Sequence, residues 1–255
     1  MGKIIGIIPA RWGSTRFPGK ALHPIADKPL IQRVWERCQA ASKLDGVIVA
    51  TDDLRIAEAA FAFGAEVAMT ASTHQSGTDR IAQVAARLGR DVTHVINVQG
   101  DEPTISPVLI DRLATALKRD KKLPMVTAAN LIRDWSELEN SNVVKVVLAK
   151  NGDALYFSRS VIPHPFGRSA EATGVTFHRH QGIYGYERRF LAQFVRWKPS
   201  PYELCERLEQ LRALENGARI RVLVTEFLSL GVDTPEDVPR AEEQILAGYG
   251  VGVFD

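Results

Sequence analysis

Short runs of apolar residues alternate with amphipathic helical patterns, and this alternation constrains the fold more than any other feature of the sequence. Residues 3–8 and 47–50 form two such runs, and the stretches after them space their apolar side chains at helical intervals. A third run, 94–98, is followed by another helical pattern. Strands that alternate with helices in this way form a mostly parallel sheet covered by helices on both faces. The sequence therefore predicts an α/β fold.

The alternation stops in the middle of the chain. Two strand-like runs flank Asn151-Gly152, a dipeptide typical of a tight hairpin, and a third extended run covers 178–186. We interpret residues 125–190 as an inserted antiparallel β region at one edge of the sheet. The length of the chain suits a single domain, 1–255, that contains this insert.

Helical patterning returns after the insert. Four leucines from Leu204 to Leu214 form a helical stripe that we expect to pack in the core, and Gly217 ends the pattern. A final strand is expected at 220–224. Thr234, followed by a proline, then predicts the start of a C-terminal helix.

Composition excludes several classes of protein. Charged residues make up 24% of the chain, and the net charge is only +2, which is too balanced for a general nucleic-acid or membrane-surface binder. The apolar run at the start ends at Pro9, too early for a secretory signal, and no run approaches the roughly 18 apolar residues of a membrane span. The two cysteines, Cys38 and Cys205, fit a reducing compartment. We expect a cytoplasmic protein without nucleic-acid or membrane partners.

The segment that follows the first strand, residues 9–20, carries the clearest chemical signal. Ligands of open α/β sheets bind at the carboxyl ends of the strands. Arg11, Arg16 and Lys20 place three cations there, and glycines leave backbone N–H groups accessible, which suits a polyphosphate. A P-loop would have serine or threonine after the lysine as a magnesium ligand, but here Ala21 follows. The alternative is a surface loop with solvated cations.

Two aspartates at the ends of secondary-structure elements are candidate magnesium ligands. Asp101 follows the buried run 94–98, and Asp233 precedes the C-terminal helix. Two carboxylates beside a basic loop suit a magnesium ion bound to a triphosphate, whose phosphate oxygens and waters complete the coordination. Taken singly, each aspartate is more simply explained as a turn or cap residue. Only a fold that brings them together supports the metal site.

Seven segments resemble, in order, the signatures of the 3-deoxy-manno-octulosonate (Kdo) cytidylyltransferases, or CMP-Kdo synthetases. The resemblance extends from Ile4 to about Ile245, nearly the whole chain. It implies a nucleotide-diphospho-sugar-transferase fold, dependence on Mg²⁺ and a homodimer built through the inserted strands. The segments are Pro9–Arg11 with Ser14–Lys20, His74–Thr78, Asn97–Pro103, Ala154–Arg159, Arg179–Tyr186, Leu208–Arg212 and Gly231–Pro235.

The resemblance also implies roles for individual residues. Lys20, Asp101 and Asp233 would be catalytic, with the two aspartates holding magnesium. The triphosphate would be bound by Arg11, Arg16 and Lys20. The cytidine pocket would be lined by Ser76, Thr78, Arg80 and Gln99. Kdo would be contacted by Arg159, His180, Tyr184, Glu209 and Gln210. One position departs from the family pattern. The family usually reads Arg-His-Leu-Gly here, and in this chain Gln181 takes the place of the leucine.

The implied reaction transfers CMP from CTP to Kdo and releases pyrophosphate, supplying lipopolysaccharide biosynthesis. Three alternatives remain at this point. The acid sugar can be 8-amino-Kdo or a sialic acid in place of Kdo. A non-catalytic nucleotide-binding regulator is less favoured, because it has no need of both metal ligands. A nicotinamide oxidoreductase is also less favoured, because no strand is followed by Gly-x-Gly-x-x-Gly.

Overall fold

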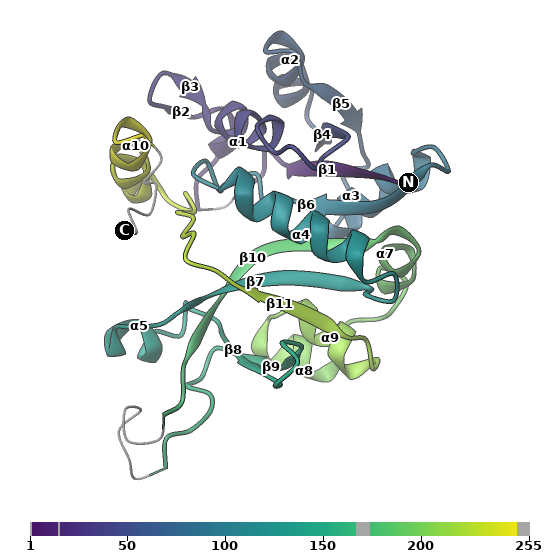
Figure 1. The fold of residues 1–255 in the computed structure, drawn as a ribbon. Helices are drawn as coiled ribbons and strands as arrows, with labels where there is room; N and C mark the ends of the chain where they lie inside the picture. Colours follow the sequence, from purple (N-terminus) through teal and green to yellow (C-terminus); the bar gives the residue numbers. More distant parts are fainter. Residues whose placement is uncertain (1, 15, 167–173, 249–255) are drawn as a thin grey trace.

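The computed structural model describes residues 2–14, 16–166 and 174–248, and within them nine strands form one mixed sheet (Figure 1). The main path across the sheet is β11-β7-β10-β6-β1-β4-β5, with β8 and β9 paired beside β10. The strands are β1 Lys3–Ala10, β4 Gly46–Thr51, β5 Glu66–Met69, β6 Val92–Asn97, β7 Met125–Leu131, β8 Lys145–Leu148, β9 Ala154–Ser158, β10 His178–Glu187 and β11 Ile220–Val224. A separate small ribbon joins β2 Pro24–Ile25 to β3 Lys28–Pro29.

Helices cover both faces of the sheet. They are α1 Leu30–Gln39, α2 Leu54–Ala62, α3 Gly77–Arg87, α4 Pro107–Arg119, α5 Trp135–Glu139, α7 Arg188–Phe194, α8 Pro201–Glu206, α9 Gln210–Glu215 and α10 Val238–Leu246, with 3₁₀ turns η1 Lys20–Leu22 and η2 Pro235–Asp237. On one face, α1, α2 and α4 pack against Ile4 and Ile8 of β1. On the other, α3, α7 and α9 share a core with Ile5 and Ile7. The predicted α/β architecture is confirmed.

Two strands of residues 125–190, β7 and β10, lie inside the sheet, so the predicted place of this region at one edge was wrong for them. β10 is antiparallel to both of its neighbours, β6 and β7, as expected for this region. The edge beyond β7 is taken by β11, which pairs with β7 in parallel. Residues 125–130 are all buried, in keeping with a strand that has a neighbour on each side. Of the strands described in this region, β8 and β9 form a side ribbon, and its hairpin at Asn151-Gly152 is confirmed.

The leucine stripe predicted for residues 204–214 is divided between two helices. Arg207 adopts a left-handed conformation, with φ of 54°, and separates α8 from α9. Leu211 is fully buried, but Leu204 is 65% exposed, so its predicted core position was wrong. Gly217, with φ of 77°, ends the pattern as expected.

The parallel strands β1, β4 and β6 end at the same side of the sheet and bring their loops together there. Gly100 lies so close to the end of β1 that an added Cβ would be 2.6 Å from the Pro9 carbonyl oxygen. Only glycine allows this approach without a shift of the backbone. The loops after β1 and β6 therefore face each other across a short gap. Among the described residues, no helix has the length and apolar character needed to cross a bilayer.

Candidate active site

A pocket opens where the loops after β1 and β6 meet the start of α3 and the loop after β11. Four stretches that are far apart in the sequence contribute to it. Eight of the residues proposed from the sequence line its wall: Arg11, Arg16, Lys20, Ser76, Arg80, Gln99, Asp101 and Asp233. Ser14, His74 and Gln75 line it as well. The fold thus gathers cations, carboxylates and a helix start in one cavity.

The two aspartates share one cation. The Lys20 Nζ donates to Asp101 Oδ2 at 2.8 Å and to Asp233 Oδ1 at 3.2 Å. Arg16 adds a second contact to the same Asp233 oxygen, at 3.1 Å. The backbone N–H of Val232 donates to the Asp101 carbonyl at 2.8 Å, which fixes one loop against the other. The pairing that the sequence left open is therefore present in the fold.

Asp233 is also held by its own loop. The backbone N–H groups of Asp233 and Thr234 both donate to Asp237 Oδ2, each at 2.9 Å. Thr234 is the N-cap of η2, so the cap predicted from Thr234 and Pro235 is confirmed, although a 3₁₀ turn precedes α10. This network orients the Asp233 carboxylate toward Lys20.

The carboxyl chemistry of the pocket suits magnesium. No group of three or more His, Cys, Asp and Glu side chains that could hold a metal occurs among the described residues. Two carboxylates are a small protein ligand set, which magnesium accepts because it retains waters and takes phosphate oxygens. The adjacent Glu102 is a poorer anion, because burial and the nearby charge of Asp101 raise its pKa to about 7.

Contacts with the Trp12 ring hold the basic loop after β1 in place. The guanidinium carbon of Arg55 lies 3.4 Å from the centre of the Trp12 ring. Gly19, with φ of 71°, passes so close to that ring that a Cβ would be 3.2 Å from it. Arg55 is itself bonded to Asp53, the N-cap of α2, at 2.6 Å. These contacts fix the loop that carries the three cations.

The start of α3 presents its polar side chains to the pocket. Ser76 is the N-cap and accepts the Asp79 N–H at 3.1 Å. Arg80 is only 4% exposed and pairs with Asp52 at 3.3 Å. The sequence interpretation missed Asp52, although it follows β4 just as Asp101 follows the end of β6. Position at the end of a parallel strand was the signal that could have found it.

Thr78 does not line this pocket and instead contacts the residues proposed for the sugar. Its hydroxyl donates to Glu209 Oε2 at 2.5 Å. On the same side, Gln99 Nε2 donates to the Gly182 carbonyl of β10 at 3.1 Å. These two hydrogen bonds join the nucleotide-side residues to the second group of proposed residues, on β9, β10 and α9.

In the second group Gln210 is buried, while Arg159, His180, Tyr184 and Glu209 are partly buried. His180 packs against Phe157 and Tyr184, with ring centres 5.0 and 5.4 Å away, and its Nε2 lies 3.0 Å from Thr127 Oγ1. Burial lowers the pKa of His180 to about 3, so the ring is neutral at neutral pH. Burial also raises the pKa of Tyr184 well above its ordinary value. Both side chains can therefore act only as neutral hydrogen-bonding groups.

Arg159, proposed as a sugar contact, is fixed at the end of β9 from two sides. Its N–H and Nε donate to the Glu206 carboxylate and carbonyl at 2.9 and 2.8 Å. On the other side, the fully buried Lys145 donates to the Arg159 carbonyl and to those of Asn140 and Val143. The sequence interpretation missed Lys145 and Glu206, because nothing local marks a lysine within a strand as a backbone anchor.

Gln210 is buried and incompletely bonded. Its side chain is 4% exposed, and its Nε2 has no hydrogen-bond partner among the described residues. A buried amide donor without an acceptor is costly unless a ligand provides one. The neighbouring Glu209 has its pKa raised by burial and lowered by the Thr78 hydrogen bond. The arrangement suits a ligand with several hydroxyl groups.

Comparison with known proteins agrees with this chemistry. The family model described as Cytidylyltransferase matches residues 5–220. A 3-deoxy-manno-octulosonate cytidylyltransferase of Geobacter metallireducens is 50% identical over 250 residues, covering 95% of this chain and 98% of the relative. That of Solibacter usitatus is 48% identical and covers 98% and 99%. The chain belongs to the 3-deoxy-manno-octulosonate cytidylyltransferase family.

Solved structures agree as well. A CMP:2-keto-3-deoxy-manno-octonic acid synthetase complexed with CTP superposes with a TM-score of 0.90 at 39% identity, covering 96% of this chain and 99% of that one. A 4-diphosphocytidyl-2C-methyl-D-erythritol synthase from Anaerococcus prevotii shares the fold, with a TM-score of 0.63 at 14% identity and 96% of each chain covered. The family resemblance found in the sequence is confirmed. The chain is therefore a nucleotidyltransferase and neither an oxidoreductase nor a non-catalytic regulator.

Gln181, the departure from the family pattern, does not share the environment of His180. Its Nε2 donates to Asn130 Oδ1 at 2.5 Å and to the Phe227 carbonyl at 2.7 Å. Successive residues of a strand point to opposite faces, and His180 points to Phe157 instead. The added amide therefore bonds to the strand β7 and to the segment after β11.

Proposed function

We propose that this chain transfers CMP from CTP to Kdo, giving CMP-Kdo and pyrophosphate for lipopolysaccharide biosynthesis. One observation carries the proposal: three cations of the loop after β1 face two aspartates that share Lys20 in one pocket. That arrangement suits a nucleoside triphosphate with its metal. The names of the relatives specify the sugar, and the similar solved structure contains CTP.

The proposed reaction is an in-line displacement. The anomeric hydroxyl oxygen of Kdo forms a bond to the α-phosphorus of CTP, while the bond to the β-phosphate oxygen breaks and the hydroxyl proton is released. Arg11, Arg16 and Lys20 would offset the charge of the triphosphate. Positioning and charge neutralisation supply most of the catalysis in this type of transfer, so no covalent nucleophile is needed.

Magnesium is part of this proposal. Asp101 and Asp233 would hold it, and when bound it would add positive charge beside the triphosphate. Lys20 supports this assignment, because it already brings both carboxylates to one cation. The nucleotide would then reach a site in which the carboxylates and cations are preorganised.

Recognition of the sugar would fall to the second group of residues. The guanidinium of Arg159 suits the Kdo carboxylate, while neutral His180 and the unpartnered Gln210 amide suit its hydroxyl groups. A site that pairs polar groups rejects analogues that leave those groups unpaired, by up to ~10⁴-fold. We therefore expect a strong preference for Kdo over N-acetylneuraminate. Transfer to 8-amino-Kdo is the alternative within the family.

The test is a pyrophosphate-release assay with four nucleoside triphosphates against Kdo, 8-amino-Kdo and N-acetylneuraminate. CTP with Kdo should give the highest kcat/KM, and excess EDTA should abolish turnover. Folded protein that releases no Kdo-dependent pyrophosphate would show that the proposal is wrong. A higher kcat/KM with one of the other acids would transfer the assignment to that sugar.

The proposal also includes a cytoplasmic homodimer. CTP is a cytoplasmic substrate, and both described cysteines are free thiols. Region 125–190 exposes large apolar side chains, which an isologous two-fold interface would cover; they include Leu131, Trp135, Leu155 and Phe166. Light scattering should give twice the mass of one 28.2 kDa chain at micromolar concentration. The mass of a single chain would exclude the dimer.

A further inference from the structure

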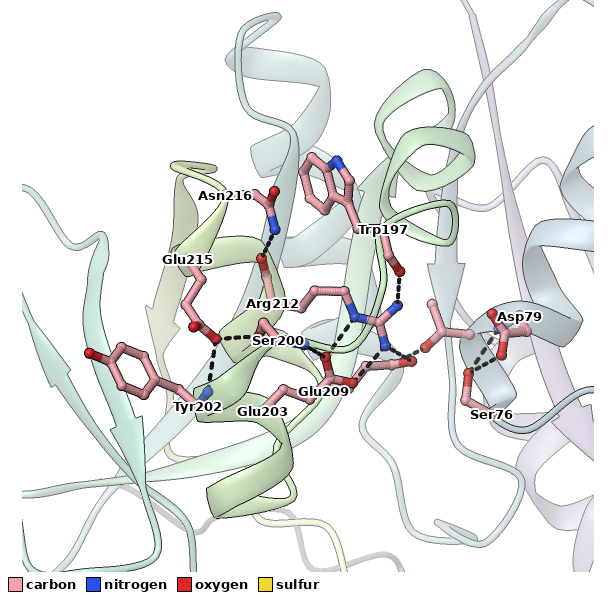
Figure 2. Close-up of polar contacts among 11 residues, drawn as sticks. Ser76, Asp79, Trp197, Ser200, Tyr202, Glu203, Glu209, Arg212, Glu215 and Asn216 are labelled. Atoms are coloured by element: carbon pink, nitrogen blue, oxygen red, sulfur yellow. Dashed lines mark hydrogen bonds and ion pairs between the residues drawn. The ribbon is translucent and has the colours of Figure 1, made fainter.

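Arg212 lies at the centre of a buried polar network that joins α8 and α9 to the active site (Figure 2). Its Nε and Nη2 donate to the two carboxylate oxygens of Glu203 at 2.7 and 2.6 Å. Its Nη1 donates to the Trp197 carbonyl at 3.2 Å, and its guanidinium lies over the Phe194 ring at 4.8 Å. Arg212 is only 7% exposed, so this geometry is held in a dry environment.

The same guanidinium reaches the carboxylate proposed to contact Kdo. Nη2 of Arg212 lies 3.6 Å from Glu209 Oε1, while Glu209 Oε2 accepts the hydroxyl proton of Thr78. Figure 2 shows Glu209 between Arg212 and the start of α3, where Ser76 and Asp79 lie. Glu209 is thus held by a cation on one side and by the nucleotide-side helix on the other.

We infer that Arg212 is a positioning residue that favours the ionised form of Glu209 and holds its carboxylate beside Thr78, where it can accept a hydrogen bond from a hydroxyl group of the sugar. This inference rests on the proposed function only for the identity of that sugar. The holding of Glu209 itself is a property of the free protein.

The charges around Glu209 show why it needs this cation. Burial disfavours its ionised form. The groups that face it are Thr78, Ser76 and Asp79 of α3, Tyr184 and Tyr186 of β10, and Arg212 of α9. Arg212 is the only cation in that set, and Asp79 acts against ionisation. Removal of Arg212 should therefore raise the pKa of Glu209 further.

A purely structural role for Arg212 makes a different prediction. Arg212 also ties α9 to α8 through Glu203, and Ser200 and Glu215 continue that tie. If Arg212 served only to hold α9 against α8, replacing Arg212 or replacing Glu203 would have the same effect on the pKa of Glu209. The variants Glu203→Gln and Arg212→Met separate the two roles, because Glu203→Gln leaves the cation beside Glu209.

The experiment measures the pKa of Glu209 by ¹³C NMR in protein with labelled glutamate, with Glu209→Gln to assign the resonance. In Arg212→Met this pKa should rise by about one unit or more, in line with the loss of a nearby opposite charge. Arg212→Lys should give a smaller rise, since the cation remains but the forked geometry is lost. Glu203→Gln should lower the melting temperature without raising the pKa. Arg221→Met, which breaks the 2.6 Å pair with Asp153, is the matched control and should leave the pKa unchanged.

Kinetics supplies the second readout. The acid limb of kcat/KM for Kdo should move to higher pH in Arg212→Met, with about a tenfold loss near that limb, while KM for CTP changes little. An unchanged pKa of Glu209 in Arg212→Met would overturn the inference, as would an equal shift in Glu203→Gln. If Arg212→Met does not fold, Arg212→Lys and Glu203→Gln decide the matter by the same comparison. The titration of Glu209 needs no substrate. An inactive wild-type protein would therefore refute the proposed function without changing the measured effect of Arg212 on the pKa of Glu209.

Discussion

The two sides of the proposed active site are built in opposite ways. On the nucleotide side, charged groups meet in a pocket open to water, and the Asp233 side chain is half exposed. On the sugar side, Gln210 is buried and His180 and Tyr184 are partly buried, and desolvation disfavours the charged forms of both rings. Charges in water can exchange one partner for another at little cost, whereas buried polar groups need a partner from the fold or from the ligand. The nucleotide side is thus suited to a metal and a polyphosphate that come and go, and the sugar side to one fixed shape.

The largest effect is expected from breaking the carboxylate pair on the nucleotide side. Asp101→Asn and Asp233→Asn should each fold normally and lose on the order of 10²–10³ in kcat, as when a preorganised electrostatic group is removed. If both hold one metal, the double variant should be little worse than the worse single variant. Steady-state kinetics with circular dichroism measures both points. Additive losses, or near-wild-type activity in a single variant, would contradict a shared metal.

On the sugar side, Gln210→Met should separate activity from stability. It removes a buried donor that has no partner, so stability to urea should stay equal or increase. The kcat/KM for Kdo should fall about 10–100-fold, because a hydrogen bond to the ligand is lost. Gln244→Met is a matched control, since Gln244 also has an unpartnered buried amide atom but lies on α10. A loss of activity in the control, or none in Gln210→Met, would count against this role.

The close approach of the loops after β1 and β6 can be tested by replacing glycines with alanine. Gly100→Ala would place a Cβ 2.6 Å from the Pro9 carbonyl oxygen, so the backbone must shift. We expect a loss of about 1–3 kcal/mol in the free energy of unfolding. Gly13→Ala meets nothing within 4 Å and should be neutral. Denaturant titration of the two variants measures the difference, and equal stability would show that the close approach is not needed.

The partly buried His180 predicts a smaller effect that depends on pH. The pKa of His180 is about 3 in the folded protein, below its ordinary value of 6.5, so the unfolded chain binds a proton first as the pH falls. Stability should therefore decrease from about pH 6.5 downward, by at most about 1.4 kcal/mol per pH unit from this residue. His180→Gln should show a flatter slope between pH 7 and 5. Parallel slopes for the two proteins would mean that the histidine is not buried as described.

The elements that rest on local patterns could be predicted from the sequence. The strand at 220–224, the Thr234 cap and the Asn151-Gly152 hairpin are all present, because apolar period, side-chain capping and turn chemistry act over a few residues. The place of 125–190 within the sheet was not predictable in this way. It depends on β11 pairing with β7, which is a contact between distant segments. The break between α8 and α9 at Arg207 could not be predicted. Nothing in the sequence distinguishes an arginine with a left-handed backbone conformation from any other arginine.

The residues of the candidate site also divide into those that could be predicted from the sequence and those that could not. Residues in the loops after strands, such as Lys20 and Asp101, could be proposed from chemistry and position, and the family signatures supplied most of the others. The side chains that hold these residues could not. Lys145, Glu206 and Arg212 act through contacts with segments distant in sequence or across a break between helices. No spacing rule distinguishes them from ordinary charged residues.

The position of β10 sets an order in which the molecule can be assembled. β6 has β1 on one side but keeps an open edge until residue 187 has been synthesised, because β10 is its other neighbour. The chain is synthesised from its N-terminus, so the cations of the first loop and the start of α3 are made before β10 can close the sheet. Asp233 comes after β11 and joins last. A nascent chain therefore has the groups that attract a nucleotide before it has the carboxylate pair proposed to use it.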